Sequence, residues 1–153
     1  MINSKIVSLC VVLVIIILFN VGAFTNNLYA VDNINIGITA SCADNNILCV
    51  SNLDTSQSSN ITGLCIAAFV FALLCVLALL VVLFGLFISK KSLVHYGSGC
   101  ALFLMTLVLI LCLSIPSVYS DGLSVSNISY SLILIIVSFC LMFMKCAYLF
   151  NMK

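Results

Sequence analysis

The chain has 153 residues, of which 65% are hydrophobic and only 6% are charged, and its formal net charge is +1. A soluble domain carries about 25% charged residues, so this composition excludes a protein whose whole surface faces water. The densest basic cluster is Lys90-Lys91, which is too short for a nucleic-acid-binding surface. The sequence therefore indicates an integral membrane protein with the lipid bilayer as a partner.

Four apolar segments are each long enough to cross the bilayer as a helix, since a span needs about 20 apolar residues. They cover residues 6–24, 64–88, 94–115 and 130–150. None alternates polar with apolar residues, as a barrel strand does. We therefore expect an all-α membrane protein, a bundle of four transmembrane helices that forms a single domain over residues 1–153.

The first segment also has a second interpretation. Lys5, the apolar run of residues 6–19 and the residues Val21-Gly22-Ala23 resemble a secretory signal peptide with its cleavage site. Cleavage would leave three spans and an outside N-terminus, with the later segments oriented as before. We favour the retained helix and keep the cleaved peptide as the alternative.

The charges separate onto opposite sides of a path with four spans. All five lysines fall on one side, and the four acidic residues fall on the other: Asp32, Asp44, Asp54 and Asp121. Because an excess of lysine marks the cytosolic side, we expect both termini in the cytosol, outer loops at residues 25–62 and 116–129, and residence in the plasma membrane. Lys145, in the last turns of the fourth segment, is expected to extend its ammonium to the inner headgroups.

The first outer loop is the only sizeable segment outside the spans. Ile34, Ile36 and Ile38 alternate with polar or small residues, which predicts a short strand with one apolar face. Cys42 and Cys49 lie in the same loop, on the oxidising side of the membrane, where we expect them to form a disulfide.

Two glycosylation sequons begin at Asn60 and Asn127, both on the expected outer side, and these are candidate glycosylation sites. The remaining seven cysteines lie in apolar segments, where cysteine acts mainly as a small packing residue. Cys146, beside Lys145 near the inner interface, is also a candidate for palmitoylation.

Small residues recur at four-residue spacing in two segments, as Ala68 with Ala72 and as Gly97 with Ala101. Such spacing lets helix backbones approach closely in lipid. It serves either packing within the bundle or lateral assembly with other copies, and the sequence does not separate the two.

No constellation for catalysis is present. His95 is the single histidine, and no acidic residue lies in any of the four segments. A proton relay needs intramembrane acids, a nucleophile needs a base beside it, and a zinc site needs more His and closely spaced Cys ligands. We therefore expect no enzyme, no cofactor, no metal and no small-molecule substrate, and a transporter or channel is disfavoured.

The layout resembles the claudin superfamily, which includes the peripheral myelin protein group. Gly37, Ile38, Cys42 and Cys49 match in kind its loop signature of Gly-Leu-Trp followed by two cysteines, although Thr39 stands where that family has Trp. The resemblance implies an outer face of short antiparallel strands on a left-handed four-helix bundle. It also implies roles in cell contact, barrier formation, membrane organisation or regulation of a channel partner.

Two functions are therefore expected. The first is a claudin-like structural or adhesive protein of cell junctions, which organises cell contacts or membrane assemblies by self-association. The alternative is an accessory subunit of a channel, transporter or receptor, which binds another membrane protein through its helices.

Overall fold

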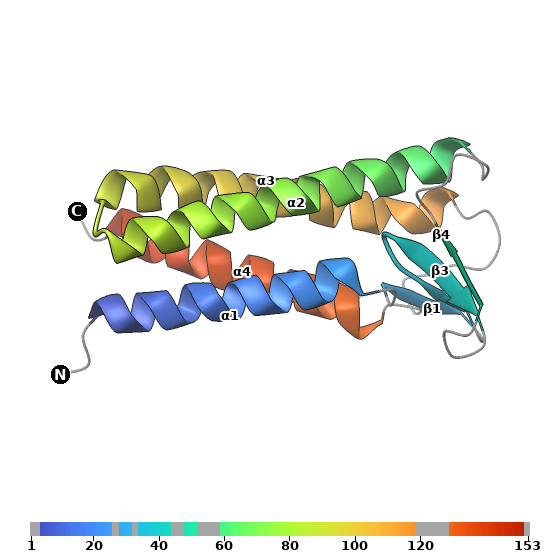
Figure 1. Cartoon of the computed structure of the whole chain (residues 1–153), viewed down its shortest axis with the longest axis horizontal. Helices are drawn as coiled ribbons and strands as arrows, with labels where there is room; N and C mark the ends of the chain where they lie inside the picture. The colour runs from blue at the N-terminus through green and yellow to red at the C-terminus, as the bar shows by residue number, and fades with distance from the viewer. Residues whose placement is uncertain are drawn as a thin grey trace.

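In a computed structural model, the chain forms four long helices and one small sheet (Figure 1). The structure describes residues 4–25, 28–31, 34–43, 48–51, 59–118 and 129–151. The helices are α1 (Ser4–Phe24), α2 (Ser59–Phe87), α3 (Lys91–Val118) and α4 (Tyr130–Asn151). All four are long and apolar enough to cross a membrane, which confirms the four expected spans at this level.

The four helices run side by side, and the sheet lies at one end of the bundle (Figure 1). Each helix packs against two neighbours, α1 and α3 both lying between α2 and α4. We call the end that carries the sheet the sheet end. The opposite end, where α1 begins, α4 ends and Lys5, Lys90 and Lys91 lie, is called the lysine end.

A tight turn at the lysine end joins α2 to α3. Ser89 adopts a positive φ of 57°, and the Lys90 N–H donates to the Gly85 carbonyl over 3.0 Å. The ammonium of Lys5, in the first turn of α1, donates to the Ser89 hydroxyl over 2.7 Å and to the Phe87 carbonyl over 3.2 Å. The contact with Phe87 satisfies a carbonyl that the end of α2 leaves without a helical partner, and the two contacts together fix α1 to the turn.

Size, rather than polarity, separates the inner and outer faces of α2. The helix is apolar all round, but its buried positions carry mainly small residues, whereas leucines and phenylalanines such as Leu77, Phe84 and Phe87 are exposed. In lipid, helix association depends on close packing because apolar burial gives no driving force there. Small inner residues therefore allow α2 to lie close to its neighbours.

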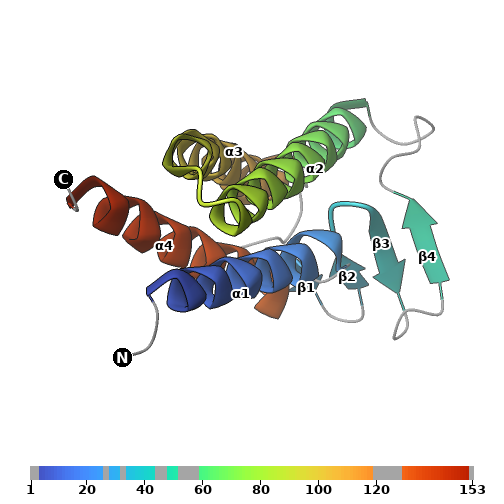
Figure 2. The ribbon, with the colours of Figure 1, turned by 60° about the vertical axis from the view of Figure 1, so that its left-hand side comes forward.

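The sheet has four short strands, β1 (Tyr29–Val31), β2 (Ile34–Ile36), β3 (Ala40–Ala43) and β4 (Leu48–Ser51). They lie in the order β1-β2-β3-β4, and each neighbouring pair is antiparallel (Figure 2). The expected strand over residues 34–38 is present as β2, but it ends at Ile36. The chain turns at Gly37, whose N–H donates to the Ala40 carbonyl over 2.9 Å, and Ile38 is wholly buried beyond it.

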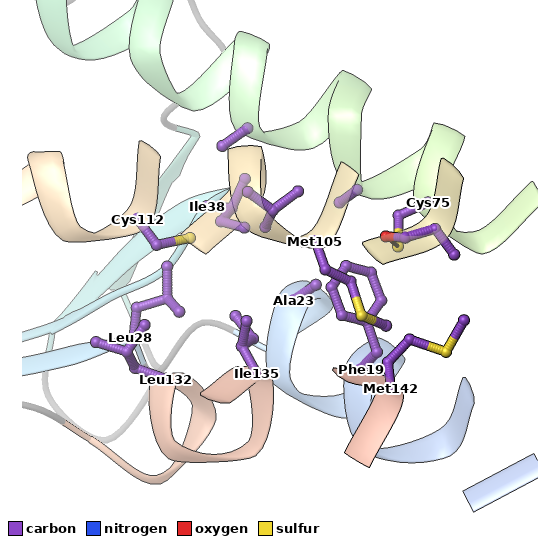
Figure 3. Packing of buried hydrophobic residues seen from close by; sticks show 14 of the residues in the cluster. Phe19, Ala23, Leu28, Ile38, Cys75, Met105, Cys112, Leu132, Ile135 and Met142 are labelled. Carbon is purple, nitrogen blue, oxygen red and sulfur yellow. Dashed lines mark hydrogen bonds between the residues drawn. The ribbon is translucent and has the colours of Figure 1, made fainter. Parts of the chain in front are cut away.

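One face of the sheet rests on the helices. Tyr29 and Ile36 are direct partners across β1 and β2, so they share a face, while Asn35 and Cys42 share the other. Tyr29 and Ile36 belong to the same buried cluster as the inner residues of the bundle. Figure 3 shows Leu28, which precedes β1, close to Leu132 of α4. The sheet therefore extends the core of the bundle at one end.

Candidate functional site

A hydrogen bond fixes the sheet to α3, and it uses a backbone carbonyl that a proline leaves without its helical donor. In a helix the carbonyl of Cys112 would accept from the N–H of residue 116, but residue 116 is proline and has no N–H. The buried Tyr29 hydroxyl instead donates to the Cys112 carbonyl over 3.0 Å. Burial, together with the nearby Cys112, raises the pKa of Tyr29 to about 12, so its hydroxyl keeps its proton near neutral pH and remains a donor.

Further hydrogen bonds tie the entry to the sheet to α1 and α4. The Thr25 hydroxyl lies 2.5 Å from the Ser131 hydroxyl and also donates to the Val21 carbonyl. The Leu28 carbonyl accepts from the Ser129 N–H over 3.0 Å. The first strand is thus bound to α3, and the segment that leads into it is bound to the start of α4.

The cysteines fall into two groups. Cys42 on β3 is the direct cross-strand partner of Cys49 on β4, and the Cys42 side chain is buried. The seven cysteines of the helices are free thiols: Cys10, Cys100 and Cys140 are exposed, whereas Cys65, Cys75, Cys112 and Cys146 are buried.

Cys146 is the residue that the sequence marks for palmitoylation. Its side chain is 6% exposed, and its Sγ lies 3.7 Å from the Ser98 carbonyl oxygen of α3. Acylation at Cys146 would therefore have to displace this contact between α3 and α4.

The small residues at four-residue spacing face the interior of the bundle. Ala68, Ala72 and Ala101 have no exposed surface, and a Cβ added at Gly97 would lie 2.9 Å from Val82 Cγ2 of α2. These faces already pack within one chain, so lateral assembly with other copies has to use other surfaces.

Lys145 lies on the inward face of α4 in the structure. Its side chain is 8% exposed, and its Nζ is enclosed with no hydrogen-bond partner among the described residues. Lys145 continues the inward series of α4 formed by Ser131, Ile135, Ser138 and Met142, at the three- and four-residue steps of one helix face. The helix therefore directs this lysine inward.

The remaining predicted residues are dispersed. His95 is exposed in the first turns of α3, and Asn60 lies in the first turn of α2. Asn127 and the four aspartates lie outside the described residues. Within the described part of the chain, no three His, Cys, Asp or Glu side chains are grouped to hold a metal ion.

No protein-family model matches the chain, and no curated protein or solved structure matches it. The functional argument therefore depends on two features of the fold: the sheet fixed to one end of the bundle and the buried lysine near the other. Sequence analysis missed the role of Tyr29 and of Ser98. Pro116 signals that the Cys112 carbonyl lacks its helical donor, but the identity of the replacement donor depends on the tertiary fold.

Proposed function

We propose that this is a four-span structural or adhesive membrane protein that organises cell contacts or membrane assemblies, with the sheet as its outer recognition surface. The observation that carries the proposal is the attachment of the sheet, by the Tyr29 hydrogen bond and by a shared core, to the end of a membrane-length bundle. A platform that is already ordered loses little conformational freedom on binding. Its second face, which bears the partly exposed Asn35, is turned away from the helices.

The same proposal includes a disulfide between Cys42 and Cys49. Their direct pairing across β3 and β4 supports it, because antiparallel cross-strand partners lie close enough for a bond between sulfurs. Cys42 is also not a free thiol. With Gly37 and Ile38 in the turn before β3, this arrangement is similar to the outer loop of the claudin superfamily, and it motivates a claudin-like role.

The proposed orientation places the lysine end in the cytosol and the sheet outside, in the plasma membrane. The three lysines Lys5, Lys90 and Lys91 gather at one end of the bundle, which supports it through the preference of lysine for the cytosolic side. The retention of α1 as a span is supported by its share in the core, to which Ile15 and Phe19 contribute fully buried side chains.

The proposal is tested by mixing cells that express the full chain, fused at its C-terminus to a fluorescent protein, with cells that lack it. We expect enrichment at contacts between two expressing cells. Asn35→Lys and Ser51→Lys, on the outward face and the edge strand of the sheet, should abolish this enrichment. Ser92→Lys, the same change at an exposed position of the lysine end, is the matched control and should leave the enrichment intact.

Uniform distribution of the wild-type chain, or equal loss in all three variants, would contradict an adhesive sheet. If the chain instead co-purifies in mild detergent with a larger membrane protein in fixed stoichiometry, the accessory-subunit alternative replaces it. Surface labelling of Lys-substituted sheet residues in intact cells checks that the variants reach the plasma membrane and that the sheet faces outward.

A further inference from the structure

Two buried polar groups near the lysine end have no partner in the described part of the chain. They are Nζ of Lys145 on α4 and Oγ of Ser98 on α3, whose side chains are 8% and 1% exposed. The two helices meet at this level, since Cys146 Sγ lies 3.7 Å from the Ser98 carbonyl oxygen. The polar groups therefore lie on adjoining parts of two packed helices.

The chemistry of these groups determines what can satisfy them. An ammonium has three donors and no acceptor, and a hydroxyl can also donate, so the missing partner must be rich in acceptors. A buried ammonium also needs a negative counter-charge. None of the described residues is Asp or Glu. The described part of the chain therefore offers this ammonium no counter-charge, which points to another molecule as its source.

The distance of Lys145 and Ser98 from the ends of their helices favours a partner group at the membrane surface. Lys145 lies six residues before the last residue of α4, or about 9 Å along the helix, and Ser98 lies a similar distance from the start of α3. Lys90 and Lys91 are exposed at this end, and clusters of lysine attract anionic headgroups. Gly99, the residue after Ser98, is exposed, and a Cβ added there would meet no neighbouring atom within 4 Å. The outer surface of α3 therefore begins one residue from the enclosed Ser98 hydroxyl.

We propose that Lys145 and Ser98 bind the phosphate group of an anionic phospholipid at the lysine end of the bundle. Both atoms are enclosed in the structure, so binding requires the flexible four-carbon stem of Lys145 to turn its ammonium toward the lysine end. There the phosphate oxygens accept from the ammonium and from the Ser98 hydroxyl. The inference does not depend on the adhesive function proposed above, because it concerns the opposite end of the molecule.

The experiment uses the full-length protein in neutral detergent and measures retained lipid by native mass spectrometry. Phosphatidylglycerol and phosphatidylcholine are offered in parallel, and inorganic phosphate without lipid forms a third arm. We expect one phosphatidylglycerol to be retained in preference to phosphatidylcholine. Lys145→Met should lower its affinity at least roughly tenfold, because a hydrogen bond to a charged group is worth that factor or more, and Ser98→Ala should lower it less. Lys90→Met is the matched control and should retain the lipid.

Equal retention of the two lipids, or retention by Lys145→Met at the wild-type level, would overturn the proposal. An equal loss in Lys90→Met would show surface attraction only and would also overturn it. Stabilisation by inorganic phosphate alone would assign the site to a free anion instead of a lipid. Loss of a stoichiometric acidic membrane partner in Lys145→Met, with lipid retention unchanged, would replace the lipid with a protein. Should Lys145→Met fail to fold, Ser98→Ala decides the matter, because it should still lower the retention of phosphatidylglycerol, and retention at the wild-type level would overturn the proposal.

Discussion

Replacing Tyr29 with phenylalanine removes one hydroxyl and keeps the ring in place. The Cys112 carbonyl then loses its donor inside the protein, since residue 116 is proline and supplies none. Leaving a buried acceptor unsatisfied costs about 1–3 kcal/mol, so we expect Tyr29→Phe to lower the free energy of unfolding by that amount. The assay is reversible unfolding of the purified chain by SDS in mixed micelles. Tyr148→Phe, at an exposed position of α4, is the control and should change it by less than about 0.5 kcal/mol.

A double-mutant cycle with Pro116→Ala tests the reason for the effect. Alanine restores an N–H at residue 116, which can donate to the Cys112 carbonyl along the helix. Tyr29→Phe should therefore cost less in the Pro116→Ala background, with a coupling energy of about 1 kcal/mol or more. An equal cost in both backgrounds would refute the argument that Tyr29 replaces the donor that proline lacks.

Three further predictions concern packing, the sheet and the thiols. Gly22→Ala should destabilise the protein by about 1–3 kcal/mol, because the new Cβ would lie 2.7 Å from a backbone oxygen of α4. Gly63→Ala, with open space around it, should stabilise the protein by up to about 1 kcal/mol. Equal effects of the two substitutions in thermal unfolding would contradict the packing of α1 on α4. Cys42→Ser should lower the free energy of unfolding by about 2.5 kcal/mol, the loop-closure value for eight residues. Reduction of the wild-type protein should have the same effect. An unchanged free energy of unfolding on reduction would exclude the proposed bond to Cys49. Maleimide labelling of the folded protein in mild detergent, read by peptide mass spectrometry, should spare the buried helical thiols and modify the exposed ones, which are Cys10, Cys100 and Cys140; labelling in the reverse order would contradict the assigned faces.

The number and placement of the helices could be predicted because apolar length alone determines them. Which face of each helix points inward could not, since segments such as α2 are apolar all round and carry no amphipathic signal. Lys145 illustrates the consequence. Its position near the end of a span favoured an ammonium at the headgroups, but its register with Met142 and Ser138 places it on the inward face.

The sheet was predicted only in part, for a related reason. Its strands have three or four residues each, and alternation is hard to recognise over so short a run. Only the series Ile34, Ile36 and Ile38 gave a signal, and its last member lies in the turn after β2. The attachment of the sheet to α3 depends on the hydrogen bond between Tyr29 and Cys112. These residues are 83 positions apart, so no local sequence pattern connects them.

The pairing of the first helix with the last has a consequence for biosynthesis. Gly22 of α1 packs against Ser131 and Ile135 of α4, and these partners are translated more than 100 residues after it. Until they emerge from the ribosome, the face of α1 that packs on α4 contacts lipid or a chaperone in the bilayer. During this time α2 and α3 can already pack together as a helical hairpin around their short turn. The last helix to be inserted therefore completes the bundle, and a nascent chain that stops before Tyr130 leaves α1 without its main neighbour.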